Sequence, residues 1–172
     1  MDAVRAATPD CPKTTNEADM IPGPTQDVRT TRYLKSTPGA LYRGLTDGRL
    51  LVEWFKLFGE DLAGATVEPQ PGGAFDLTRA QAGASLETYP ACVIEARSGA
   101  RIVITTALGA GYRPTGVHNP ATLILDLHEI ASGTRLEASL IQTDGARPGP
   151  LASWDDGVAR LDSLAADMTQ NS

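Results

Sequence analysis

The side chains that could perform chemistry are few, and they are not grouped into a known catalytic motif. The chain has two histidines, His118 and His128, and two cysteines, Cys11 and Cys92. Metal sites and thiol- or serine-based catalysis need such residues at short, characteristic spacings. Glycine-rich phosphate loops, the GxSxG elbow and the HExxH helix are also absent from the sequence. The sequence therefore predicts no bound metal and no cofactor, and it identifies no catalytic residue.

Arg79 is the most informative polar residue, because strand alternation places it on the same face as Phe75 and Leu77. A guanidinium on an apolar face must reach water or pair with an anion, since burying it alone is very costly. One interpretation is that Arg79 extends into solvent at the edge of the sheet. The other is that it binds the carboxylate or phosphate of a ligand at a pocket mouth.

A turn-rich loop at 109–120 supplies the remaining candidates, Tyr112, Arg113 and His118. An imidazole can exchange a proton near neutral pH, so His118 is either simply solvated or a general base at a pocket rim. We expect this loop to lie near Arg79 and to close over any pocket that forms there. That arrangement would favour anionic apolar ligands over neutral analogues.

The elements that position these residues follow from changes in hydrophobic period. Residues 27–35 alternate weakly and predict a first strand. Ser36-Thr37-Pro38 then begins a helix, with proline in its first turn. Asp47 is expected to cap a second helix that runs over 47–58.

Three hairpins are predicted next, over 65–79, 91–108 and 121–142, and each turn contains glycine. In the first, Gly72 and Gly73 allow the positive φ that a tight turn requires. In the second, alternation turns Ile94 toward the interior and Val93 outward. Because Val93 and Ile124 are apolar residues expected on the outer face, we predict a homodimer.

The C-terminal segment returns to a helical period. Six apolar residues recur at spacings of three and four: Leu151, Trp154, Val158, Leu161, Ala165 and Met168. The predicted fold class is therefore α+β: two short helices after the first strand, then a curved antiparallel sheet of about seven strands wrapped around one long C-terminal helix. Residues 1–25 read as a flexible arm, and residues 26–170 as a single domain.

Composition excludes several classes of partner. With 172 residues and a formal net charge of −6, the chain does not suit nucleic acid or an anionic membrane surface. It has no apolar run of membrane-spanning length and no visible signal peptide, so we expect a cytoplasmic protein.

Several segments occur in an order that is typical of one family. ALYRGLTDGRLLVEWF is similar to its helical opening, VEPQPGGAFDL to its strand–Pro-Gly-Gly–strand hairpin, and GTRLEASL and SWDDGVARLDSLA to its final strand and helix. Over about residues 27–168 the chain resembles the activator of Hsp90 ATPase homologue 1-like (AHSA1-like) branch of the START/Bet v 1-like SRPBCC superfamily. The resemblance implies a helix-grip fold with a cavity between the long helix and the concave sheet.

With the strand faces assigned above, the residues that would line this cavity are Trp54, Phe75, Leu77, Arg79, Ile94, Ile104, Leu125, Leu136, Trp154, Val158 and Leu161. Alternatively, these side chains simply fill a solid core. An aromatic content of 5% leaves less side-chain volume per position, which favours a cavity.

The expected function is binding of a small apolar or acidic-apolar molecule in this cavity. A second interpretation is an enzyme of the superfamily, a cyclase, lyase or hydrolase acting on a hydrophobic carbonyl compound. A third is an Hsp90-type co-chaperone. The third is disfavoured because the segment 1–25 is too short to form a separate chaperone-binding domain.

Overall fold

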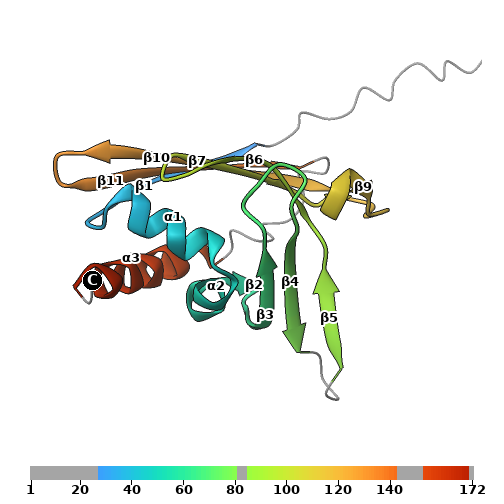
Figure 1. Cartoon of the computed structure of the whole chain (residues 1–172). Coiled ribbons are helices and arrows are strands. Elements are labelled where there is room, and N and C mark those ends of the chain that lie inside the picture. Colours follow the sequence, from blue (N-terminus) through green and yellow to red (C-terminus); the bar gives the residue numbers. More distant parts are fainter. Residues whose placement is uncertain (1–26, 81–84, 143–152, 171–172) are drawn as a thin grey trace, which may run out of the picture.

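The computed structural model describes residues 27–80, 85–142 and 153–170. The arm predicted at 1–25 and the Leu151 position lie outside the described residues. Figure 1 shows one sheet spread over two helices, and a second group of strands that runs away from it beside a third helix. The predicted α+β helix-grip fold is confirmed.

The helical opening forms where the caps predicted it. Strand β1 (Val28–Leu34) leads into α1 (Pro38–Thr46), where Thr37 is the N-cap, and α2 (Gly48–Trp54) follows directly. The Asp47 carboxylate caps α2 by accepting a hydrogen bond of 3.0 Å from the Arg49 backbone N–H. The helix predicted over 47–58 is too long, because the chain leaves the helix after Trp54 and forms β2 (Lys56–Leu57).

The strands form two main antiparallel sheets. The five-stranded sheet has the order β1-β11-β10-β7-β6 and contains β6 (Cys92–Arg97), β7 (Arg101–Thr105), β10 (Ala121–Ile130) and β11 (Gly133–Gln142). The four-stranded sheet has the order β2-β3-β4-β5 and contains β3 (Glu60–Val67), β4 (Phe75–Ala80) and β5 (Leu86–Tyr89). A short pair, β8 (Leu108–Gly109) and β9 (Arg113–Pro114), flanks the 3₁₀ turn η1 (Ala110–Tyr112).

The two sheets are continuous at one point, where β5 is followed almost directly by β6. Ala74 bridges to Cys92, and the Phe75 N–H donates to the Ala91 carbonyl at 2.9 Å. One run of chain therefore pairs first with β4 and then with β7. This connection turns the strands around the helices and makes the sheet surface concave (Figure 1).

Helix α3 (Trp154–Gln170) lies beneath the five-stranded sheet and is tied to the start of α1. The Asp162 carboxylate accepts hydrogen bonds from the backbone N–H groups of Lys35, at 3.2 Å, and Ser36, at 3.0 Å. The Ser36 hydroxyl donates to the Asp162 carbonyl at 2.9 Å, and the fully buried Thr134 hydroxyl donates to the Ser36 carbonyl at 2.7 Å. The helix, the connection after β1 and the β10–β11 turn are thereby fixed to one another.

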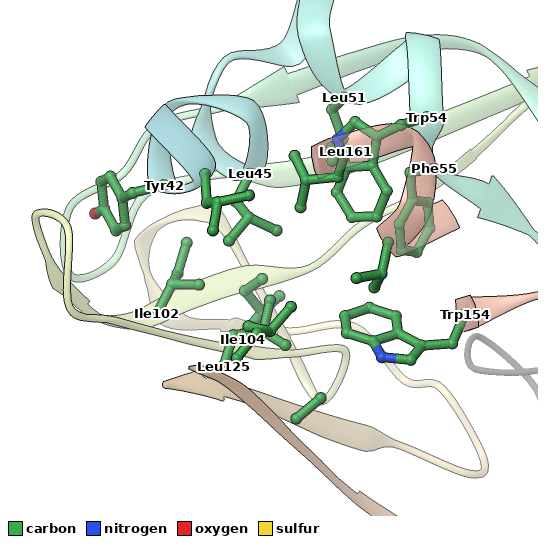
Figure 2. Packing of buried hydrophobic residues seen from close by; sticks show 14 of the residues in the cluster. Tyr42, Leu45, Leu51, Trp54, Phe55, Ile102, Ile104, Leu125, Trp154 and Leu161 are labelled. Atoms are coloured by element: carbon green, nitrogen blue, oxygen red, sulfur yellow. The ribbon is translucent and has the colours of Figure 1, made fainter. Parts of the chain in front are cut away.

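The predicted common core of Trp54, Phe75 and Trp154 is confirmed, since all three are buried in one hydrophobic cluster. The two indole rings meet edge to face, with centroids 6.4 Å apart, and Trp54 also contacts the Phe55 ring. Figure 2 shows these rings gathered between the helices and the sheet. Contact between the first residue of α3 and the last residue of α2 thus holds the helical layer together.

Replacing Trp154 with alanine is expected to lower the free energy of unfolding by ~3–5 kcal/mol, the range for large core truncations. Urea unfolding followed by circular dichroism measures this loss. The matched control is Tyr33→Ala, because Tyr33 is 72% exposed, and its change should stay within about 0.5 kcal/mol. Equal losses in both variants would contradict this account of the core.

Strand β6 contains a bulge that reverses the predicted faces around Ile94. Pairing with β7 passes from Val93–Ile104 directly to Glu95–Val103, so Ile94 has no partner in the ladder. Val93 is completely buried in the core, whereas Ile94 is 37% exposed. The predictions that Ile94 lines the cavity and that Val93 faces outward are both wrong, because strict alternation fails at a bulge. The homodimer was predicted from Val93 and Ile124 on the outer face, and Val93 does not support it because its side chain is buried.

The two glycines of the β3–β4 turn are needed for different reasons. Gly72 has φ +81°, as the turn prediction requires. Gly73 is needed for space, because a Cβ atom there would lie 2.1 Å from the Glu68 carbonyl oxygen. The turn is closed further by the Glu68 carboxylate, which accepts a hydrogen bond of 3.0 Å from the Ala74 N–H.

The Gly73→Ala substitution is therefore expected to destabilise the protein by ~1–3 kcal/mol, the cost of forcing an extra methyl group into a filled space. Gly64→Ala is the control, since the nearest atom to a Cβ there is 4.0 Å away. Thermal unfolding of the two variants compares them directly. An unchanged midpoint for Gly73→Ala would show that this turn relaxes freely.

Candidate ligand-binding cavity

A cavity of about 700 Å³ lies between the helical layer and the concave sheet. Its helix side comes from α1, α2, the segment that follows α2, and the first residue of α3; its sheet side comes from β4, β7, β10 and β11. The lining residues are predominantly apolar. Figure 2 shows Trp54, Phe55 and Trp154 facing Ile104 and Leu125 across this region.

Six of the predicted lining residues lie in the cavity wall: Trp54, Phe75, Leu77, Ile104, Leu125 and Trp154. Three others, Leu136, Val158 and Leu161, are buried in the core but do not reach the cavity. They pack where α3 contacts the sheet and α1. The residues predicted to line the cavity are therefore divided between the cavity wall and a solid part of the core.

The residues predicted at the mouth are exposed and do not line the cavity: Tyr112, Arg113 and His118. The Tyr112 ring instead lies against Gly72, where a Cβ atom would be only 2.9 Å from it. The same loop does reach the cavity, but through Val117 and Asn119. The 109–120 loop therefore borders the cavity, but through residues other than the three predicted at its mouth.

Arg79 shares the face of Leu77, as alternation predicted, but its surroundings differ from those expected. Its guanidinium pairs with Glu60 at 3.0 Å and with Glu87 at 3.3 Å. Its Cζ atom also lies 5.7 Å from the ring centroid of Phe58 and 5.5 Å from that of Tyr89. Arg79 is thus neutralised within the protein and stacked between two rings, and it does not line the cavity.

The position of Arg79 also contradicts the predicted proximity to the 109–120 loop. The loop meets the turn of the β3–β4 hairpin, where the Gly111 N–H donates to the Gly72 carbonyl at 2.8 Å. Arg79 lies at the other end of β4, roughly 13 Å further along the strand. The predicted preference for anionic ligands through Arg79 therefore has no support from this geometry.

Phe58 and Tyr89 form an aromatic edge to the cavity. Both line it, and their rings meet edge to face with centroids 5.7 Å apart. Phe58 has φ +54°, a backbone conformation that is costly for an aromatic residue, and it is 53% exposed. The guanidinium of Arg79 stacks on both rings and so holds this edge in place.

Burial raises the pKa of Tyr89 above its ordinary value of 10.0, and the hydrogen bond of 2.6 Å that its hydroxyl donates to Glu87 raises it further. The folded protein thus favours the protonated phenol. The contribution to stability is complete below pH 10 and is lost as pH rises through the folded-state pKa.

The unfolding free energy is accordingly expected to fall as the pH is raised from mildly to strongly alkaline, and to fall less in Tyr89→Phe. Urea unfolding at several alkaline pH values measures the slope. Tyr33→Phe is the control, because the Tyr33 side chain is largely exposed to solvent. If Tyr89→Phe keeps the parental slope, the phenol of Tyr89 does not carry this dependence.

The polar part of the cavity is uncharged. Thr106, Asn119 and Gln142 line it, and Gln142 pairs in register with Ala121, two residues after Asn119. The Thr106 hydroxyl is engaged, since it accepts from the Ala121 N–H at 2.9 Å. Among the lining residues that the structure describes there is no Asp, Glu, Lys, Arg or His.

Sequence reasoning missed the wall segment after α2, which contributes Phe55, Leu57 and Phe58. These residues continue the apolar pattern of α2, and no residue type marks the end of the helix at Trp54. It also missed Tyr89, Pro90 and Ala91 around the β5–β6 junction. By contrast, Leu123 and Leu140 share the face of Leu125 and could have been found by alternation alone.

The fold and its cavity define a START/Bet v 1-like protein of the helix-grip type. The family model described as "Activator of Hsp90 ATPase homolog 1-like protein" matches residues 35–161, which is most of the chain. The protein therefore belongs to this AHSA1-like family. A search of curated proteins found no match to the sequence.

Solved structures share the fold at low sequence identity. A protein of Nitrosomonas europaea has a TM-score of 0.70 at 24% identity, over 84% of this chain and 96% of that one. An AHSA1-like protein from Aeromonas hydrophila has a TM-score of 0.61 at 11% identity, over 83% and 94%. The di-domain ARO/CYC protein StfQ of the steffimycin biosynthetic pathway has a TM-score of 0.57 at 14% identity, over 84% of this chain and 51% of StfQ.

Two further observations concern the described residues alone. They contain no group of three or more His, Cys, Asp or Glu side chains that could hold a metal ion. None of their helices is long and apolar enough to cross a membrane.

Proposed function

We propose that this protein binds a small, uncharged and mostly apolar molecule in the cavity between its helices and its concave sheet. The observation that carries the proposal is a cavity of about 700 Å³ with an apolar wall and no charged side chain among its described lining residues. Its volume falls within the range of small-molecule sites, which extends over roughly 300–1,000 Å³.

Energetics support an occupant of this kind. An empty apolar void is unfavourable, because the atoms that line it lose packing contacts that a bound molecule would restore. Water can occupy the polar end near Asn119 and Gln142, where it finds hydrogen-bond partners. Along the apolar remainder it has few partners, and an apolar molecule is the better occupant.

The charges around the cavity decide between neutral and acidic ligands. A buried carboxylate needs a cation, and the nearby Arg79 already pairs with Glu60 and Glu87. The proposal is therefore narrower than the sequence-based expectation of an apolar or acidic-apolar molecule. Acid–base catalysis finds no support in the cavity either, because Tyr89 is the one titratable lining residue among those described, and its hydroxyl donates to Glu87.

Binding of the neutral dye Nile red, followed by its fluorescence, tests the proposal. Leu123→Trp places a large ring in the cavity and should weaken binding at least tenfold. Ile141→Trp is the matched control on the adjacent strand, because Ile141 is 40% exposed and does not line the cavity, and it should bind the dye as the parent does.

Competition between two ligands of equal length tests the charge preference. Dodecan-1-ol is expected to displace Nile red at concentrations at least tenfold lower than dodecanoate at neutral pH, since only the carboxylate must lose its hydration without gaining a cation. Stronger competition by dodecanoate, or unchanged dye binding in Leu123→Trp, would overturn the proposed function.

A further inference from the structure

Phe58 occupies a backbone position that disfavours aromatic residues. Leu57 pairs with Glu60, so Phe58 and Gly59 are the two central residues of the β2–β3 turn. Their φ angles are +54° and +84°, and a two-residue turn with both angles positive favours asparagine, aspartate or glycine at its first position. A bulky side chain in this conformation is strained, and it persists only where its surroundings hold it there. The presence of phenylalanine in this turn therefore needs an explanation.

The ring of Phe58 lies where the cavity meets solvent. Phe58 lines the cavity and is 53% exposed, whereas its neighbours in the same wall segment, Phe55 and Leu57, are 8% and 5% exposed. Its ring meets the ring of Tyr89, another lining residue, edge to face. The strained residue thus places an apolar ring over the border of the cavity, where the small polar residues that the turn favours would leave it uncovered.

Arg79 holds the turn in this position. Its guanidinium pairs with Glu60, which directly follows the turn, and with Glu87 on β5, and it stacks on the Phe58 ring. These contacts join the tip of the β2–β3 hairpin to β5, which lies two strands beyond β3 in the sheet. All of them are side-chain contacts. The turn can therefore move away from β5 without loss of a backbone hydrogen bond between strands.

A second residue with the same backbone conformation provides a comparison. Among the described residues, Tyr112 is the other non-glycine residue with positive φ, at +59°, and it is 51% exposed. Its ring lies against Gly72 and does not line the cavity. Phe58 and Tyr112 therefore match in ring type, exposure and backbone strain, and they differ in their position relative to the cavity.

We propose that the Phe58 ring covers the bound ligand at the border of the cavity, and that movement of the β2–β3 turn controls release of the ligand. This inference rests on the proposed function and adds the control of ligand release to it. The other border with an exposed apolar side chain is at Val117, which lines the cavity and is 44% exposed. Strain favours the border at Phe58, because Val117 has no positive φ to be explained.

The rates at which Nile red binds and leaves test this role. In Phe58→Asn the turn receives a residue that it favours and the cavity loses its cover. Stopped-flow fluorescence at several protein concentrations is expected to show release faster by about tenfold, the scale of lost ring contacts, and association no slower than in the parent. Tyr112→Asn is the matched control, and both of its rate constants should stay within about twofold of the parental values. Val117→Ala should accelerate release less than Phe58→Asn does.

Unchanged release in Phe58→Asn, or faster release in Val117→Ala than in Phe58→Asn, would overturn this inference while leaving the proposed function intact. A merely structural role of the ring would lower the thermal unfolding midpoint of Phe58→Asn without accelerating release. Failure of the parent to bind Nile red would overturn both the inference and the proposed function.

A measurement on the parent protein does not depend on the folding of the variants. In the complex with Nile red, the ring protons of Phe58 are expected to give nuclear Overhauser effects to the dye. Those of Tyr112 should give none, because its ring does not line the cavity. A complex in which the dye contacts Trp54 and Trp154 but not Phe58 would also overturn the inference.

Discussion

Helix α3 is fixed against a sheet that is too wide for it to cover. Five strands extend over about 19 Å from first to last, whereas a helix with its side chains is about 10 Å across. The bonds from Asp162 to the Lys35 and Ser36 backbone hold α3 and α1 together under one part of the concave face. The other part, between Trp154, the end of α2 and strands β7, β10 and β11, stays open as the cavity. The cavity thus results from a sheet that is wider than the helix packed against it, and the rings of Phe58 and Tyr89 form its edge.

The sequence carries the fold through short-range signals that do not depend on distant residues. Thr37 and Pro38 begin α1, Asp47 caps α2, and glycine-containing turns mark the hairpins. The stripe of apolar residues in α3 identifies the face that packs on the core. Because each of these signals lies within a few residues of the structure that it produces, the family and the fold class could be predicted from the sequence.

The candidate site was less predictable, since it depends on long-range contacts and on departures from regular geometry. The partners of Arg79 come from β5 and from the start of β3, and no sequence pattern links Glu60 and Glu87 to it. The end of α2 at Trp54 brings Phe55 and Phe58 into the wall, although both fit the helical pattern. The positive φ of Phe58 arises in the two-residue turn after β2, and that turn is visible only once the pairing of β2 with β3 is known.

The bulge in β6 means that the strand is one residue longer than its pairing with β7 requires. Removal of Ile94 would join Val93 to Glu95, and every other side chain would keep its present face. Such a deletion would nevertheless straighten the strand, because a bulge bends the sheet locally. A deletion of this single residue would therefore change the curvature of the sheet without changing which of the remaining side chains face the core.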